Sequence, residues 1–337
     1  MYFHPCAPNP RSRWRARRAA SLLLLVLLAC ERDPAHLREA PTASPEPGLP
    51  TPELAERLLA TVRSLSDDAL EGRRVGTAGN REARRHLAAE LEAAGVEPLL
   101  PEYRQRFPLE DGVEGVNLVG RLPGAGAGDR HLLLGAHYDH LGVRDGRVFN
   151  GADDNASGVA VVLEIARRVS ERPLEHSLVV VLFDAEEPGL HGSRALVAAP
   201  PIELADLLLA VNLDMVARGD GRGLWAAGSY HYPELRPVLE AVAARAPIPL
   251  RLGHDRPEDR DDDWTLLSDH APFHLAGIPF VYFGVEDHPD YHQPSDDWER
   301  IDPRFFAGSA LAIEEALRAL DRALADGLRF ERERPLR

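Results

Sequence analysis

The chain has 337 residues, 44% of them hydrophobic, so it can bury a sizeable core in one large α/β domain or two smaller ones. It carries 54 acidic residues against 39 basic ones, a formal charge of −15, and it contains no Lys. An acidic surface of this kind repels phosphate backbones, which argues against nucleic-acid binding.

The first thirty residues are typical of an export signal. An Arg-rich segment precedes the apolar run 22–29, which is too short to span a bilayer and fits the core of a signal peptide. The letters LLAC at 27–30 resemble the lipobox of bacterial lipoproteins, in which the cysteine becomes the lipidated first residue; ordinary signal-peptidase cleavage nearby is the alternative. We therefore expect an exported bacterial protein, either periplasmic or anchored to a membrane through Cys30. The other cysteine, Cys6, lies in the segment to be removed, so no disulfide is expected.

Proline and hydrophobic patterns divide the rest of the chain. Six prolines make 31–52 an extended tether, followed by a single catalytic domain at 53–328 and a charged tail at 329–337. Apolar residues at helical spacing predict helices at 51–65, 80–94, 155–169, 193–198, 233–244 and 303–324. Apolar runs predict strands at 116–122, 131–136, 177–183, 207–213 and 278–283. This alternation predicts an α/β fold, a three-layer α/β/α sandwich with a mixed, mostly parallel central sheet. The acidic run 258–263 is expected to be a solvated loop, with calcium binding the lesser alternative.

Polar motifs follow the first predicted central strand and open the next helix. His137, in AHYDH, precedes Asp139, which is placed to orient the second ring N–H of a ligating histidine. Asp154, in GADDNASG, opens the helix, where a carboxylate can either cap the helix or bind metal. Taken alone, the capping role is favoured.

Three further motifs complete the pattern at later strand ends. Glu186 and Glu187 are adjacent, so one carboxylate can bind metal while the other acts as a general base. Asp214 follows another apolar strand, where an unpaired acid would be costly. The segment YHQPSD at 291–296 supplies a phenol, a second imidazole and another acid. Each motif alone has an ordinary explanation, but two His and three carboxylates at successive strand ends form a complete set for two ions sharing one carboxylate.

In these motifs the sequence resembles the co-catalytic zinc aminopeptidases of metallopeptidase family twenty-eight, which also includes the glutaminyl cyclases. The likeness runs from about Leu54 to Leu324, and the segment SDHAPF at 268–273 resembles one that lines the family's pocket wall. The resemblance implies two Zn²⁺ per chain, with manganese or cobalt as alternatives. It assigns His137 and Asp214 to the first zinc, Glu187 and His292 to the second, and Asp154 as the bridge between them. It further implies a cis peptide bond between Asp154 and Asn155, Glu186 as general base, Tyr291 as a phenol that polarises the carbonyl, and Asp139 and Asp296 as residues that orient the ligands.

Two neighbours compete within these motifs. Asp153 could replace Asp154, but the alignment of the Ala-Ser-Gly that follows favours Asp154. His288 could replace His292, but only His292 has a preceding Tyr and an Asp four residues later.

The resemblance implies metal-assisted hydrolysis of the amino-terminal peptide bond of peptides with a free amino terminus. The alternatives are a glutaminyl cyclase, another exopeptidase such as a carboxypeptidase or dipeptidase, and a non-catalytic binding relative. Phe273, Tyr282 and Trp298 could line an apolar pocket, although each is equally suited to the core. The sequence indicates neither the side-chain preference nor the oligomeric state.

Overall fold

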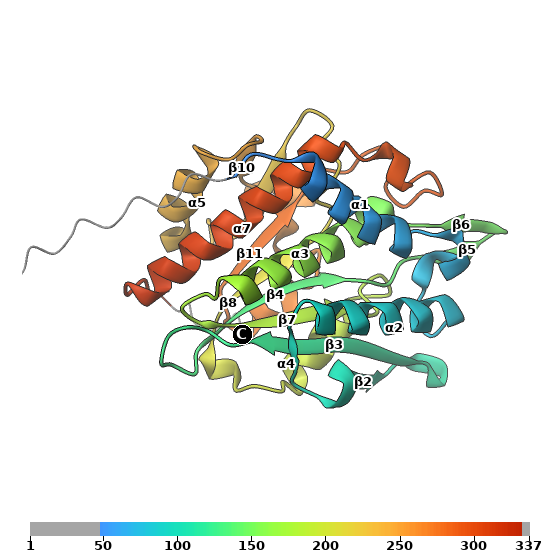
Figure 1. Ribbon diagram of the computed structural model, residues 1–337, viewed down its shortest axis with the longest axis horizontal. Helices are drawn as coiled ribbons and strands as arrows, with labels where there is room; N and C mark the ends of the chain where they lie inside the picture. The colour runs from blue at the N-terminus through green and yellow to red at the C-terminus, as the bar shows by residue number, and fades with distance from the viewer. Residues whose placement is uncertain (1–47, 332–337) are drawn as a thin grey trace, which may run out of the picture. The chain divides into compact units, whose positions relative to one another are not determined.

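A computed structural model describes residues 48–331 (Figure 1). The expected signal peptide, most of the tether and the end of the charged tail therefore lie outside the described residues. Within 48–331, no helix combines the length and the apolar character that crossing a bilayer requires.

A nine-stranded mixed sheet forms the middle layer, in the order β1-β3-β7-β4-β8-β11-β9-β10, with β2 pairing on β3. Its strands are β1 (Glu97–Pro98), β2 (Arg104–Pro108), β3 (Glu114–Leu122), β4 (His131–His137), β7 (Ser177–Phe183), β8 (Leu207–Leu213), β9 (Leu224–Ala227), β10 (Leu250–Leu252) and β11 (Phe280–Gly284). The four central strands β7, β4, β8 and β11 are mutually parallel. On one side of this set β3 runs antiparallel to β7, and on the other side β9 runs antiparallel to β11. A separate hairpin joins β5 (Gly142–Arg144) to β6 (Arg147–Phe149).

Helices cover both faces of this sheet, which completes the predicted three-layer sandwich (Figure 1). They are α1 (Pro52–Leu65), α2 (Ala78–Ala93), α3 (Gly158–Glu171), α4 (His191–Ala198), α5 (Arg236–Ala243), α6 (Ala271–Leu275) and α7 (Pro303–Ala325). The larger core lies under α1, α2, α3, α5 and α7, and a smaller one lies under α4 and α6. Successive strand residues serve opposite cores: Leu132 and Leu134 face the larger, and Leu133 faces the smaller.

The central strands are nearly all apolar because both of their faces are buried. Parallel strands end at the same edge of a sheet, so the residues that follow β4, β7, β8 and β11 are brought together there. This edge carries the candidate site.

Candidate metal centre

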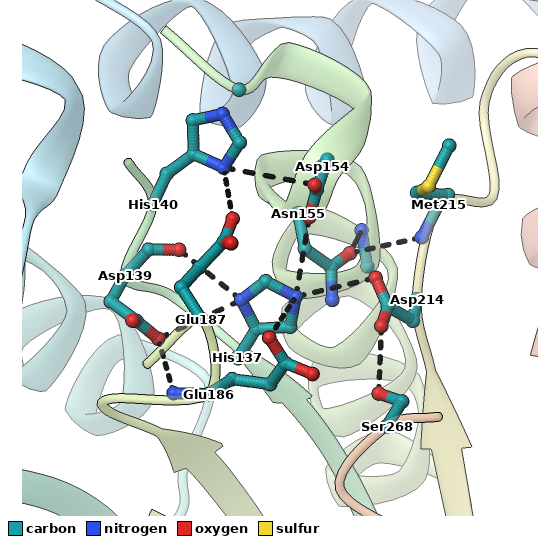
Figure 2. A network of polar contacts seen from close by, with 12 residues as sticks. His137, Asp139, His140, Asp154, Asn155, Glu186, Glu187, Asp214, Met215 and Ser268 are labelled. Atoms are coloured by element: carbon teal, nitrogen blue, oxygen red, sulfur yellow. Dashed lines mark hydrogen bonds and ion pairs between the residues drawn. The ribbon is translucent and has the colours of Figure 1, made fainter. Parts of the chain in front are cut away.

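Four of the five predicted ligands gather at the carboxyl edge of the four parallel strands in Figure 2, which labels His137, Asp154, Glu187 and Asp214. His137 is the last residue of β4, Glu187 follows β7, and Asp214 follows β8 directly. Asp154 comes from the loop before α3, and His292 from the long loop after β11. The chain turns sharply where it enters the site, because Ala185, Met215 and His292 all have positive φ values of 53–57°. Such backbone is uncommon for non-glycine residues and is concentrated at functional sites.

Asp154 lies between two groups of donors. Its Oδ1 is 3.3 Å from Nε2 of His137, which is also 3.3 Å from Oδ1 of Asp214. Its Oδ2 is 3.1 Å from Nε2 of His292, which is 3.3 Å from Oε2 of Glu187. Each carboxylate oxygen of Asp154 therefore faces its own imidazole and its own second acid.

The loop that carries Asp154 has an irregular backbone, and α3 begins only after it. Residues Ala152–Ser157 form a π-helical turn before α3, and the Asp154–Asn155 peptide bond is cis, as the resemblance implies. The Asp296 carboxylate accepts hydrogen bonds from the backbone N–H groups of Asp153 and Asp154 at 3.1 Å. Asp296 thus orients the loop that carries Asp154, whereas the predicted helix start at residue 155 is displaced to Gly158.

Asp139 connects two other site residues. Its Oδ1 accepts a hydrogen bond from the Glu186 backbone N–H at 3.0 Å and lies 3.7 Å from Nδ1 of His137. The same His137 nitrogen lies 3.2 Å from the Asp139 backbone oxygen. Asp139 therefore fixes both the imidazole and the start of the Glu186–Glu187 segment.

A fully buried arginine supports these loops from below. The Arg73 guanidinium donates hydrogen bonds to the backbone oxygens of Leu65, Tyr138, Asn150 and Gly151 at 2.5–3.0 Å. Burial lowers the pKa of Arg73 to about 10, so the side chain stays charged near neutral pH beside the acids of the site. It joins the segment after α1 to the loops that present His137 and Asp154.

Glu186 and Tyr291 line a cavity of about 350 Å³ that opens onto the ligands. Oε2 of Glu186 is 4.0 Å from Nε2 of His137, and the Tyr291 ring stacks on His292 with 4.0 Å between centroids. Tyr282 also lines this cavity, whereas Phe273 packs in the core against Phe183. Trp298 instead lies under the Arg63 guanidinium at 4.3 Å.

The electrostatics of the cluster favour bound cations. Burial lowers the pKa of His137, but the carboxylates of Asp214 and Glu186 outweigh it and raise that pKa well above its ordinary value. Burial likewise opposes a charge on His292, but Asp154 and Glu187 raise its pKa to about 10. Burial raises the pKa of Glu186 well above its usual range, and the neighbouring acids Asp214 and Asp269 add to the rise. So many buried acids around two imidazoles need positive charge.

The donor geometry fits zinc. Four ligands about 2.0–2.1 Å from a tetrahedral ion lie about 3.3 Å from one another, and mixed imidazole and carboxylate sets suit this metal. The contacts of 3.1–3.3 Å around Asp154 match that spacing on both sides. His137, Asp154 and Asp214 would hold an ion on one side, and Asp154, Glu187 and His292 would hold one on the other.

The two competing residues lie outside this arrangement. Nε2 of His288 is 3.1 Å from Oδ2 of Asp153, and the other Asp153 oxygen accepts the Ala217 backbone N–H at 2.8 Å. This buried pair braces the loops behind the site.

Sequence reasoning gave no role to three residues that contact or border the cluster. Ser268 donates a hydrogen bond to Oδ2 of Asp214 at 2.7 Å, and Asp269 is a buried acid near Glu186. His140 lies against Glu187 and Asp154 (Figure 2). Ser268 and Asp269 fall in the segment that resembled a pocket wall, but nothing in the spacing of His140 indicated its contact with Glu187, 47 positions away in the chain.

The fold and the donor set together indicate an α/β protein that binds metal at the edge of its sheet. A family model described as peptidase family M28 matches residues 117–317, which is more than half of the chain. The chain belongs to this family.

Curated relatives and solved structures agree with this assignment. The chain is 32% identical over 208 residues to leupeptin-inactivating enzyme 1 of Streptomyces exfoliatus, covering 60% of this chain and 42% of that protein. It is 31% identical over 184 residues to aminopeptidase YwaD of Bacillus subtilis, covering 50% and 36% respectively. The chain thus spans less than half the length of these relatives.

The fold is similar to those of two solved enzymes. A zinc aminopeptidase from Bacillus subtilis superposes with a TM-score of 0.62 at 18% identity, covering 78% of this chain and 94% of the other. Porphyromonas gingivalis glutaminyl cyclase gives 0.63 at 22% identity, covering 81% and 98%. At these identities the likeness shows the fold alone, a three-layer α/β/α sandwich.

Proposed function

We propose that this chain is an aminopeptidase that removes amino-terminal residues from peptides, with two zinc ions and Glu186 as the general base. The observation that carries the proposal is the division of Asp154, whose two oxygens face separate imidazole–carboxylate pairs 3.1–3.3 Å away. A bridging carboxylate with one imidazole and one acid on each side is a complete ligand set for a paired site.

The residues of the chain would divide the hydrolysis among them. A bound zinc pair would lower the pKa of a water molecule and polarise the scissile carbonyl. Glu186 would accept the proton of that water and return it to the leaving amine. The Tyr291 phenol would donate a hydrogen bond to the carbonyl oxygen as negative charge develops there. Acids around the second site would attract the free amino terminus of the substrate, which accounts for cleavage at chain ends.

The cavity wall favours an uncharged amino-terminal side chain. Trp264, Leu267 and Tyr282 line the cavity beside the ligands, together with Met215 and Val285. Leu266 also lines it, and Leu266 and Leu267 are 51% and 60% exposed, so they offer apolar surface to a bound side chain. We therefore expect leucyl substrates to be preferred over acidic ones.

A substrate panel with zinc quantified in parallel tests this function. The panel contains leucyl, glutamyl and glutaminyl peptides, each with a free and with a blocked amino terminus. The protein is stripped of metal with a chelator and reconstituted stepwise with zinc, and bound zinc is measured at each step. We expect turnover only of leucyl peptides with a free amino terminus, and we expect it to reach its maximum at about two zinc ions per chain. Cleavage of blocked peptides would refute an aminopeptidase, and glutaminyl cyclisation with a plateau at one zinc would identify a cyclase instead.

We also propose that the protein is exported and held at a membrane by a lipid on Cys30, a residue outside the described part of the chain. The support is the apolar run 22–29 followed by LLAC. Expression with a radiolabelled fatty acid in a bacterial host should label the wild type and not Cys30→Ser. Equal labelling of both would overturn lipidation at this residue.

A further inference from the structure

His140 is a buried imidazole at the metal centre that the proposed ligand set leaves unused. Its side chain is fully buried, and neither ring nitrogen makes a hydrogen bond of good geometry within the described residues. Nδ1 nevertheless lies 2.6 Å from Oε1 of Glu187 and 3.8 Å from Oδ2 of Asp154 (Figure 2). A buried polar ring without a satisfied partner is costly, so its position next to two candidate ligands requires an explanation.

His140, Asp154 and Glu187 place ligand atoms within 4.8 Å of one another, so His140 is near enough to be considered as a ligand, and the individual distances argue against it. The donor pairs that would share one ion are 3.1–3.3 Å apart, as tetrahedral ligands about 2.0–2.1 Å from a metal must be. The His140–Glu187 distance of 2.6 Å is too short for two ligands of one ion and is close to that of a charge-assisted hydrogen bond.

Glu187 accordingly uses its two oxygens differently. Its Oε2 faces Nε2 of His292 at 3.3 Å, on the side of the expected ion, whereas its Oε1 faces His140. A carboxylate held at its outer oxygen cannot rotate its inner oxygen away from the metal, which is the arrangement that supporting residues give to metal ligands.

The backbone leaves room for the His140 ring where a side chain would exclude it. Gly151 has φ 56°, and a Cβ there would lie 2.5 Å from ring carbons of His140. The backbone oxygen of Gly151 is itself fixed by Arg73 at 3.0 Å. The ring is therefore confined between this glycine and Glu187.

We infer that His140 is a positioning residue for the second metal site: with a small rotation of the Glu187 carboxylate, the 2.6 Å contact becomes a hydrogen bond from Nδ1–H to Oε1, which holds Oε2 toward the ion shared with Asp154 and His292. This inference rests on the proposed two-metal site. Loss of such a supporting group typically weakens metal binding about 10- to 100-fold. His140→Leu should therefore lower the affinity for one of the two zinc ions by about that factor. His140→Asn, whose amide N–H₂ can occupy the place of Nδ1–H, should restore most of it.

Competition with a chromogenic zinc chelator measures both affinities in the full-length protein. His131→Leu and His131→Asn are matched controls, because His131 is a buried histidine at the start of β4, whereas His140 lies in the loop that follows the other end of this strand. Wild-type zinc affinity in His140→Leu would overturn the inference, as would an Asn variant as weak as the Leu variant.

The visible absorption of the cobalt-loaded protein separates positioning from direct ligation. If His140 only positions Glu187, the absorption bands of His140→Asn should keep the wild-type wavelengths once the sites are saturated. A shift of those bands would show that a ligand was lost and would overturn the positioning role. Failure of the proposed function would instead appear in the wild type, as fewer than two zinc ions or no peptide turnover.

Discussion

The two adjacent glutamates after β7 have different surroundings, which predicts different consequences of substitution. Glu187 contacts two imidazoles, whereas Glu186 lines the cavity and lies 4.0 Å from Nε2 of His137. Glu186→Gln preserves the shape of the side chain and removes its ability to accept a proton. We expect zinc content and melting temperature to stay unchanged while kcat falls by roughly 10²- to 10⁴-fold.

The exposed Glu203, which also follows β7 in the chain, provides the control Glu203→Gln. If Glu186→Gln kept more than about half of the wild-type turnover, Glu186 would have no place in the mechanism.

Tyr291 offers a second prediction at the same scale. Burial raises the pKa of its phenol above the usual value, so the O–H remains a donor throughout the neutral range. Tyr291→Phe keeps the ring that stacks on His292 and removes only that donor. Steady-state kinetics should show kcat lowered by roughly 10- to 100-fold with KM changed little, because the interaction forms in the transition state. Tyr230→Phe, at a 43% exposed position, should behave as wild type. A change confined to KM would instead indicate a role in substrate binding.

Secondary elements differ in how far the sequence predicts them. The strands 177–183 and 207–213 have the predicted ends, because continuous apolar runs between polar turns permit few other interpretations. The strands β1, β2, β9 and β10 and the β5–β6 hairpin were not predicted. They are short and carry mixed polar and apolar residues, and pairing with neighbours makes them strands.

The residues of the candidate site also differ in how far the sequence predicts them. Three predicted ligands, His137, Glu187 and Asp214, lie at or just after apolar strands, and all five lie in short motifs that the family resemblance identified together although each motif alone has an ordinary explanation. The contact of His140 with Glu187 and the buried bonds of Arg73 join residues far apart in the chain. Only the assembled sheet brings these partners together, and no local pattern could have indicated them.

Three helices are joined by a cluster of charges on the outer side of the larger core. Glu164 of α3 lies 2.9 Å from Arg57 of α1, and Arg168 of α3 lies 3.1 Å from Glu314 of α7. Burial opposes the Glu164 charge, but hydrogen bonds from Arg57, Arg167 and Arg168 outweigh it and lower its pKa to about 2. Because the folded pKa lies below the unfolded value of about 4.3, the stabilisation is complete at neutral pH and is lost as the pH falls toward about 2.

Glu164→Gln should therefore cost about 1–2 kcal/mol of unfolding free energy at about pH 7, and this difference should shrink below about pH 4.3. Urea denaturation of the wild type and the variant across this pH range measures the difference in unfolding free energy. Both proteins are treated with a chelator so that metal binding does not contribute to it. Glu171→Gln, whose side chain is 68% exposed, should change stability far less. A difference that stayed constant down to about pH 2 would contradict the assigned origin.

For the molecule as a whole, bound metal should act as a cross-link. Residues 48–331 contain no cysteine, so no disulfide can join the loops that carry the ligands. Zinc at roughly a hundredfold excess over its dissociation constant adds about 2.7 kcal/mol per site, which raises the melting temperature of a domain this large by roughly 5–10 °C. Calorimetry with zinc and with chelator should show that rise, and the double variant His137→Ala/His292→Ala should lack it. Equal melting temperatures in the wild type would exclude tight metal binding.

The buried arginine at position 73 limits where this protein can be divided into parts that fold. It precedes the family-matched region 117–317, yet its guanidinium holds the backbone that presents His137 and Asp154. A fragment beginning at residue 117 would leave buried carbonyl groups without their donor and the acidic loops without their fixed cation. The segment 52–80 is therefore needed to form the candidate metal site and could not be exchanged independently of it. The region that the family model matches is thus smaller than the unit that must fold together to form the site.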